Sequence, residues 1–228
     1  LRRVLSSWPQ DHASAQWTIA VLELCAGGSL QRHLQKLSRC GRDSTGHPVA
    51  MTDAEVALFG GQVSAALRHL HHCRCVHRDL KPANILFYGE RHLKLCDFGF
   101  ARMCNSSERL HTICGTPIYM APELTRSASS IGRKGYEGFP VDVWAYGTLI
   151  YEMLHSRVAF PASDAEQLYR RIRAGQHAPM REDLPKEFRG LIKACLTIDP
   201  TRRPTAMELA SCPILMTCSS PEQADQRC

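Results

Sequence analysis

The chain has 228 residues, 44% of them hydrophobic and 22% charged, which is enough apolar side chain for a buried core and excludes disorder along the whole chain. Its 28 Lys and Arg residues exceed its 22 Asp and Glu residues, which gives a formal net charge of +6. The basic residues are scattered in short pairs and form no continuous stripe, so we expect no nucleic-acid partner.

The eleven cysteines are odd in number and irregularly spaced, which does not suit a disulfide framework. We therefore expect reduced thiols and a cytoplasmic or nuclear protein. The most apolar stretch, residues 141–154, is too short for a membrane span and contains Asp142 and Glu152, so no span is expected. Because the sequence begins with Leu1 and not with Met, we expect it to be part of a longer protein.

The first elements of the chain are expected to be a strand and two helices. Residues 17–24 are rich in β-forming side chains and lead to a flexible Gly27-Gly28 pair, which indicates a strand followed by a hinge-like connection. Ser29 can cap a short helix. Thr52 and Glu55 form a capping box for a longer helix, whose apolar residues recur every three or four positions.

The remaining sequence predicts one hairpin, a long loop and then mostly helix. Two short apolar strands within residues 76–98 are joined by a turn at Tyr88-Gly89. Residues 99–120 lack a clear period, and loops of that length inside a compact domain are usually functional. Helices are expected at about 141–154, 164–174, 186–196 and 204–211. This order of elements predicts an α+β fold.

Three short motifs follow one another along the chain. Residues 77–84, HRDLKPAN, match the pattern H-R-D-L-x-x-x-N at every fixed position, a chance match of about one in ten thousand over a chain of this length. Asp97-Phe98-Gly99 follows, and Ala121-Pro122-Glu123 closes the long loop. Each motif alone is weak evidence, but their order together is specific.

With these motifs the sequence resembles the eukaryotic protein kinase family, from about Trp17 to Leu215. The Lys-Pro pair after Asp79 resembles its serine/threonine branch and not its tyrosine branch. The resemblance implies an α+β, protein-kinase-like fold, with a mostly helical large lobe and a partial β small lobe. It also implies a transferase that uses ATP and Mg²⁺ to phosphorylate serine and threonine hydroxyls of protein substrates.

The resemblance also divides the chain into parts. Residues 1–215 would form a partial kinase domain, in which 1–24 are a remnant of the small-lobe sheet, 25–28 are the hinge and 29–215 are the large lobe. Residues 216–228 are expected to form a disordered tail.

Phosphoryl transfer depends on positioning and charge neutralisation, and the resemblance assigns both tasks to particular residues. Asp79 would accept or orient the proton of the substrate hydroxyl, and Lys81 would neutralise charge on the transferred phosphoryl group of ATP. Asn84 and Asp97 would supply the hard oxygen ligands that Mg²⁺ prefers beside the ATP phosphates. Thr116 would form a hydrogen bond near Asp79 and Lys81.

For the adenine of ATP, the resemblance implies that Leu22 is the gatekeeper and that Glu23 and Cys25 present backbone groups. Leu86 would form the floor of the pocket. Cys96 would lie at its inner edge, as a small core residue and not as a reactive thiol.

Thr112 begins the stretch TICGTP, which resembles the family's T-x-C-G-T-P segment. Phosphorylation there, by an upstream kinase or by autophosphorylation, would add about two negative charges. Arg78 and Arg102 would bind the phosphate through charge-assisted hydrogen bonds. An ordinary loop threonine is the alternative interpretation.

Other matches imply structural roles. Glu123 and Arg203 resemble the family's buried ion pair between the activation segment and a late helix. Asp142 resembles the acid that braces the catalytic-loop backbone from the central helix. His77 and Phe98 resemble the large-lobe half of the family's hydrophobic spine.

Part of the family pattern is missing from the sequence. There is no G-x-G-x-x-G-x-V loop, no V-A-I-K lysine and no identifiable helix glutamate to pair with it, and residues 1–16 are too few to hold them. We therefore expect the chain as given to be inactive or nearly so, and we favour truncation over genuine loss. The alternative function is an inactive kinase-like scaffold or regulatory module.

Two further interpretations stay open. Residues 71–77 contain three His and two Cys, which are zinc-ligand types, although their spacing is not that of a standard zinc finger. Residues 97–102 and 117–120 look similar to those of unc-51-like, autophagy-type kinases.

Overall fold

The computed structural model describes residues 3–5, 19–42, 46, 48–105, 108–125 and 135–216. The α-helices in these ranges are α1 (Leu30–Arg39), α2 (Asp53–His72), α4 (Gly138–His155), α5 (Ala165–Ala174), α6 (Lys186–Cys195), α7 (Ala206–Ala210) and α8 (Pro213–Met216). The strands there form antiparallel pairs, namely β1 (Arg3–Leu5) with β2 (Ile19–Val21), β3 (Cys75–Val76) with β6 (Arg102–Met103), and β4 (Ile85–Tyr88) with β5 (His92–Leu95). Short 3₁₀ turns are η1 (Pro82–Asn84), η2 (Pro117–Tyr119), η3 (Pro122–Thr125) and η4 (Pro200–Arg202). The architecture is mostly helical with a few short strands, as expected for the α+β fold predicted from the sequence.

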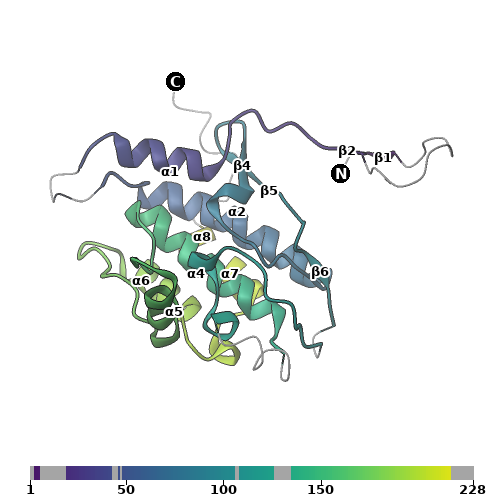
Figure 1. Cartoon of the computed structure of the whole chain (residues 1–228). Coiled ribbons are helices and arrows are strands. Elements are labelled where there is room, and N and C mark those ends of the chain that lie inside the picture. The colour runs from purple at the N-terminus through teal and green to yellow at the C-terminus, as the bar shows by residue number, and fades with distance from the viewer. Residues whose placement is uncertain are drawn as a thin grey trace.

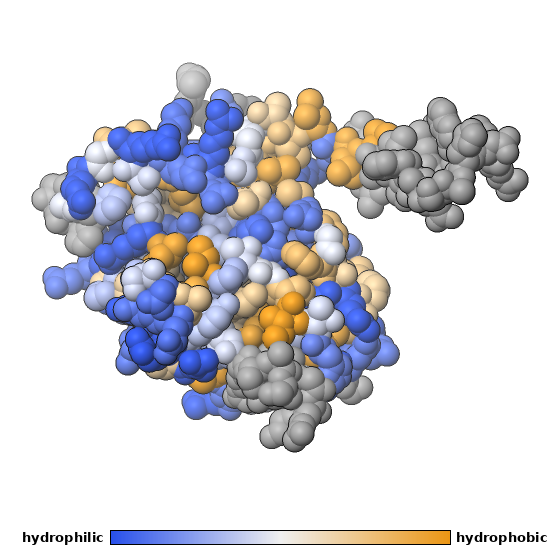
Figure 2. Space-filling model, in the orientation of Figure 1, coloured by the Kyte–Doolittle hydropathy of each residue, from blue (hydrophilic) through white to orange (hydrophobic). Residues whose placement is uncertain are grey.

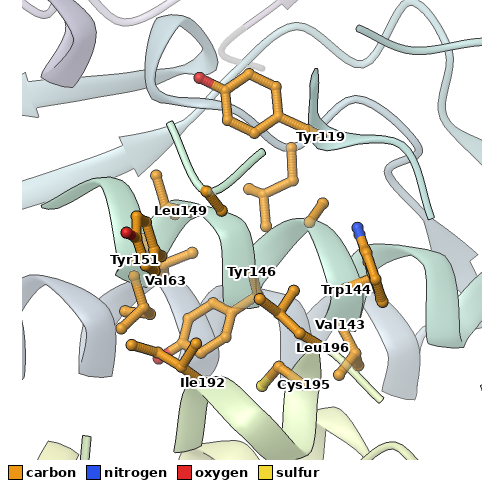
Figure 3. Packing of buried hydrophobic residues seen from close by; sticks show 14 of the residues in the cluster. Val63, Tyr119, Val143, Trp144, Tyr146, Leu149, Tyr151, Ile192, Cys195 and Leu196 are labelled. Carbon is orange, nitrogen blue, oxygen red and sulfur yellow. The ribbon is translucent and has the colours of Figure 1, made fainter. Parts of the chain in front are cut away.

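Helix α4 lies beside α2 in the middle of the helical body (Figure 1). Nearly all of its residues are buried, as expected for a helix that is apolar around its whole circumference. The rings of Trp144, Tyr146 and Tyr151 are fully buried and point in different directions from α4 (Figure 3). Of the described helices, none is long and apolar enough to cross a membrane.

Two adjacent glycines allow α2 to pack closely against its neighbours. A Cβ atom on Gly60 would lie 2.8 Å from Cδ1 of Ile150, and one on Gly61 would lie 2.7 Å from the Leu215 carbonyl oxygen. Glycine weakens a helix by about 1 kcal/mol relative to alanine. Here that cost is offset by the close packing of α2 against α4 and α8, which a Cβ atom at either position would disturb.

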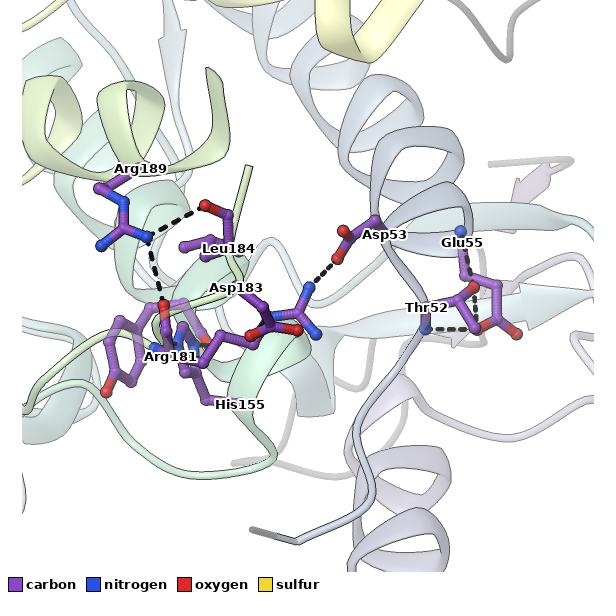
Figure 4. Close-up of polar contacts among 9 residues, drawn as sticks. Thr52, Asp53, Glu55, His155, Arg181, Asp183, Leu184 and Arg189 are labelled. Atoms are coloured by element: carbon purple, nitrogen blue, oxygen red, sulfur yellow. Dashed lines mark hydrogen bonds and ion pairs between the residues drawn. The ribbon is translucent and has the colours of Figure 1, made fainter. Parts of the chain in front are cut away.

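The N-terminus of α2 is fixed by the predicted capping box (Figure 4). The Thr52 hydroxyl accepts from the Glu55 N–H at 3.2 Å, and the Glu55 carboxylate accepts from the Thr52 N–H at 2.8 Å. The Arg181 guanidinium pairs with Asp53, and the Arg181 N–H donates to Nε2 of His155 at 3.1 Å. The segment before α6 is therefore tied to both α2 and α4.

The predicted hairpin and helices are confirmed, with shifted ends for some of them. Helix α4 begins at Gly138 and not at 141, and α7 begins at Ala206 and not at 204 because Thr205 is its N-cap. The expected loop 99–120 also contains β6 and η2, and the sequence did not predict β3. Strands of two residues are too short to leave a periodic pattern.

The ends of the chain differ more from the predictions. The strand expected over residues 17–24 is shorter, since β2 ends at Val21, and residues 17 and 18 lie outside the described residues. Met216 is the last residue of α8, so the expected tail does not include it, and residues 217–228 lie outside the description.

Strands β1 and β2 lie apart from the helical body and are joined to it by an extended segment (Figure 1). Hydrophobic side chains are visible along this segment in Figure 2. Leu22 is 63% exposed and Leu24 is 83% exposed. An exposed apolar stretch next to a strand edge is a surface that other chain segments can cover.

Candidate active site

The Asp79 carboxylate is the centre of a compact hydrogen-bond network between β3 and η1. It is almost wholly buried, and three side chains donate to it. The Lys81 ammonium lies 2.6 Å from Oδ2, the Thr116 hydroxyl 2.9 Å from Oδ1 and the Asn84 amide 3.1 Å from Oδ2. Lys81 also donates to the Thr116 hydroxyl oxygen at 2.8 Å. The structure therefore brings four of the predicted catalytic residues together around one carboxylate.

Asp142 on α4 holds the backbone that precedes Asp79. Its buried carboxylate accepts from the His77 N–H at 2.9 Å and from the Arg78 N–H at 2.8 Å. Nε2 of His71 lies 2.9 Å from the same carboxylate. Arg78 has φ +66°, which is unfavourable for a residue with a side chain and persists only where the surroundings enforce it. The two backbone bonds to Asp142 provide that enforcement.

The His77 ring connects the catalytic loop to the Asp97 motif. Nε2 donates to the Cys96 carbonyl oxygen at 3.1 Å, and Nδ1 accepts from the Asp79 N–H at 3.3 Å, an arrangement that requires the neutral ring. The ring also meets Phe98 edge to face, with centroids 5.2 Å apart. The structure thus pairs His77 and Phe98, as the predicted spine requires.

Asn84 and Asp97 lie at the same open end of the β4–β5 hairpin. Asn84 immediately precedes β4 and its carbonyl oxygen accepts from the Cys96 N–H at 2.9 Å, next to Asp97. The Asn84 amide nitrogen donates to Asp79, which leaves its side-chain oxygen as a ligand. Asp97 is exposed, and its Oδ1 accepts from the Gly99 N–H at 3.2 Å. Carboxylate and amide oxygens suit Mg²⁺ bound to phosphates, so this donor set fits the metal that the resemblance implies.

The predicted adenine-binding residues come from two segments that the backbone joins. Gly27 N–H donates to the Phe87 carbonyl oxygen at 3.3 Å, and Phe87 N–H donates to the Gly28 carbonyl oxygen at 2.9 Å. This pairing places Gly27 and Gly28 beside strand β4, which carries Leu86. Leu22, the predicted gatekeeper, is 63% exposed, and no hydrogen bond joins it to β4 in the described part of the chain.

The structure defines the surroundings of two side chains of this region, Glu23 and Cys96. Glu23 forms an exposed ion pair with Lys94 at 3.3 Å. Burial, followed by the nearby Asp97 charge, raises the pKa of the Cys96 thiol. Cys96 therefore stays protonated at neutral pH, in keeping with a small packing residue.

The predicted activation residues are only partly brought together. Thr112 is exposed, and its carbonyl oxygen accepts from the Tyr136 hydroxyl at 2.8 Å. Burial raises the pKa of Tyr136, and the Arg78 guanidinium beside it acts in the opposite direction. Arg78 Nη1 is buried and has no hydrogen-bond partner among the described residues. Arg102 instead pairs with Glu108 at 3.3 Å, so the structure does not place it on Thr112.

Gly115 is a position that the sequence pattern contains and that the structure explains. Its φ is +102°, and a Cβ atom there would lie 2.6 Å from the Arg78 carbonyl oxygen. Only glycine fits both conditions. The close approach of the two segments at this point brings Thr116 onto Asp79.

Glu123 and Arg203 form a buried, bidentate ion pair with distances of 2.7 and 2.8 Å. The Arg203 guanidinium also donates to the carbonyl oxygens of Pro140 and Ile198, and it lies 5.0 Å from the centroid of the Trp144 ring. All these contacts fix the end of the Ala121–Glu123 motif to the start of α4.

Two pairs were not predicted from the sequence. His71, considered above as a zinc ligand, faces Asp142, and among the described residues no three His, Cys, Asp or Glu side chains are grouped to hold a metal. Tyr119 donates to the Glu152 carboxylate at 2.7 Å, and burial raises the pKa of both groups. Neither pair has a signal in the local sequence, because each joins residues that lie far apart along the chain.

Comparisons with known proteins show which proteins the chain is similar to. Residues 6–215 match the family described as "Protein kinase domain". The chain is similar to the cell cycle serine/threonine-protein kinase CDC5/MSD2 of Saccharomyces cerevisiae, with 35% identity over 83% of this chain and 25% of that protein. It is also similar to the cAMP-dependent protein kinase catalytic subunit of Dictyostelium discoideum, with 36% identity over 82% of this chain and 26% of that protein.

A third relative is the serine/threonine-protein kinase plk-1 of Caenorhabditis elegans, which is 34% identical over 82% of this chain and 26% of that protein. The chain spans about a quarter of the length of each of these three relatives.

Proposed function

We propose that this chain, which belongs to the protein kinase family, carries the catalytic large lobe of an enzyme that transfers the γ-phosphate of ATP to serine and threonine hydroxyls of proteins. The observation that carries the proposal is the Asp79 network, in which one buried carboxylate accepts hydrogen bonds from Lys81, Thr116 and Asn84. A carboxylate held in this way is a fixed acceptor for a substrate hydroxyl. The proposed chemistry needs such a fixed acceptor, because phosphoryl transfer relies on positioning more than on covalent catalysis.

Each residue of the network has a task in this mechanism. Asp79 accepts a hydrogen bond from the substrate hydroxyl and thereby orients the attacking oxygen. Lys81, 2.6 Å from Asp79, holds positive charge beside the acceptor oxygen, where negative charge develops. The oxygens of Asn84 and Asp97 would hold Mg²⁺, which neutralises phosphate charge when it is bound.

Two features of the site support serine and threonine as acceptors. Lys81 follows Asp79 by two residues, as in the serine/threonine branch, and Thr116 links the two side chains with bonds of 2.8 and 2.9 Å. Two of the relatives named above, CDC5/MSD2 and plk-1, are serine/threonine-protein kinases by their printed names. The unc-51-like subfamily stays a prediction, because none of the relatives named above carries that name.

We also propose that phosphorylation of Thr112 activates the site. The support is the buried Nη1 atom of Arg78, which has no partner in the described part of the chain, and the Tyr136 hydroxyl that joins Arg78 to the Thr112 backbone. A phosphate group would give that guanidinium a charge-assisted partner. Because Arg78 precedes Asp79, the new bond would act directly on the catalytic loop.

The experiment that tests the proposal is phosphate transfer from ATP and Mg²⁺ to a generic protein substrate, using this chain extended by the coding sequence that precedes residue 1. We expect phosphoserine and phosphothreonine in the product, no phosphotyrosine, and loss of transfer when a chelator removes Mg²⁺. A folded protein that binds partners but transfers no phosphate would favour the scaffold function instead.

A further inference from the structure

A cavity lies between the C-terminal part of α2, the start of α4 and the segment that leads into α7. Its volume is about 720 Å³, within the range of sites that hold small organic ligands. None of its lining residues belongs to the 77–84 motif or to the 97–99 motif. The cavity is therefore separate from the site built around Asp79.

Apolar side chains form much of the cavity wall. These residues are Phe139, Pro140, Val143, Pro204, Ala206 and Met207. Met207 is 65% exposed although it lines a cavity, so its side chain is available to a ligand. An apolar wall of this kind favours a ligand with a hydrocarbon chain or ring.

The positive charge available at the cavity wall is that of the Arg68 guanidinium. Arg68, His69 and His72 line it and are exposed. Glu137 is the only carboxylate among the described lining residues, and it is already paired with Arg109 at 3.1 Å. Arg68 forms no ion pair with another described residue, so a negatively charged ligand group would find a free guanidinium there.

We propose that this cavity binds a small amphipathic carboxylate, whose apolar part fills the space beside Met207 and whose carboxylate pairs with Arg68. The combination of an apolar wall and one free cation favours such a ligand over a purely apolar one and over a cationic one. The arginine fork is also well suited to a carboxylate, which it can bind with two parallel hydrogen bonds.

The position of the cavity connects it to the catalytic loop. His71 lines the cavity, meets the ring of Phe139 with centroids 4.9 Å apart, and lies 2.9 Å from Asp142. Asp142 in turn accepts hydrogen bonds from the backbone N–H groups of His77 and Arg78. A ligand in the cavity is therefore separated from the catalytic-loop backbone by only two side chains.

Decanoate is a suitable probe, with decanol and decyltrimethylammonium as uncharged and cationic controls of the same chain length. Binding to the full chain is measured by calorimetry, and the amide resonances of His77 and Arg78 are followed by NMR. We expect decanoate to bind more tightly than both controls and to shift those two resonances. Neither readout needs ATP, so the result is independent of the proposed kinase activity.

Two substitutions at exposed positions test the assignment without disturbing the core. Arg68→Gln and Met207→Asp should each weaken decanoate binding about tenfold or more, because they remove the cation and the apolar contact. Arg91→Gln, at an exposed arginine on the β4–β5 turn, is the matched control and should leave binding unchanged. The proposal is overturned if decanoate does not bind at about 1 mM, if all three probes bind equally, or if Arg68→Gln and Met207→Asp bind like the unaltered chain.

Discussion

The catalytic loop and the Asp97 segment lie next to each other but are built in opposite ways. Asp79 is 4% exposed and its carboxylate has three side-chain donors. Asp97 is exposed, and Phe98 and Phe100 beside it are 48% and 46% exposed. The buried carboxylate that would orient the acceptor hydroxyl under the proposed function is therefore already held in place by this chain. The group that would hold metal and phosphates is left open to a ligand.

The largest expected effect comes from the acid that supports the buried half. Asp142→Ala removes the acceptor of two backbone N–H groups and of His71, one of these bonds buried and two part-buried. Leaving such donors without a partner should lower the free energy of unfolding by about 3–5 kcal/mol. Urea unfolding followed by circular dichroism measures this value. A loss below about 1 kcal/mol would show that the brace is not structural.

The next effect is a pH dependence from a buried histidine outside the site. Burial is the main cause that lowers the pKa of His155 to about 4, and the neutral ring accepts the Arg181 N–H. In the unfolded chain the His155 ring takes up a proton near pH 6.5, whereas in the folded chain it does so only near pH 4. The stabilisation that comes from the neutral, buried ring is therefore full above pH 6.5 and is lost as the pH falls toward 4. It amounts to roughly 3 kcal/mol.

The measurement for His155 is urea unfolding between pH 7 and pH 4.5, for the unaltered chain and for His155→Gln. The difference between the two free energies of unfolding should shrink as the pH falls. A difference that stays constant over this range would contradict the assignment.

A smaller effect is expected in the activation segment. Thr112→Ala should reduce phosphate transfer by about tenfold relative to the Thr112-phosphorylated chain, because one charge-assisted bond to Arg78 is lost. Arg78→Gln should remove the response to phosphorylation. Arg102→Gln should retain it, because Arg102 is paired with Glu108. Equal transfer by phosphorylated and unphosphorylated chains would exclude this regulation.

The smallest effect on stability is expected in the open half. Asp97→Asn should change the free energy of unfolding by no more than about 0.5 kcal/mol, because Asp97 is exposed and asparagine tolerates its φ of +60°. The same substitution removes a carboxylate ligand and should abolish Mg²⁺-dependent ATP binding, which calorimetry measures. If Asp97→Asn strongly lowered the free energy of unfolding but left ATP binding intact, Asp97 would be a structural residue, and its contrast with Asp79 would be wrong.

Much of the fold could be predicted because the signals are local. The capping box at Thr52 and the apolar spacing after it predict α2, and the turn at Tyr88-Gly89 predicts the β4–β5 hairpin. Strands β3 and β6 could not be predicted, because a two-residue pair is determined by the meeting of distant segments. The structure also explains Gly60 and Gly61, which propensity alone counts against the helix.

In the candidate site, too, the residues of the local motifs could be predicted, whereas contacts between distant segments could not. The resemblance named Asp79, Lys81 and Thr116, and the structure joins them in one network. The partner of Arg102 and the contact of His71 with Asp142 could not be read from the sequence, since both depend on how the chain folds around α4 and β6.

The most direct measurement of the central claim is phosphate transfer by Asp79→Asn, compared with the unaltered chain at a temperature where both are fully folded. Both proteins carry the upstream coding sequence, and thermal unfolding checks the folded fraction. Asp79→Asn should reduce transfer by about 10²–10⁴-fold, because the group that orients the acceptor hydroxyl loses its charge. Transfer that survives this substitution in a folded protein would contradict the role of the buried carboxylate.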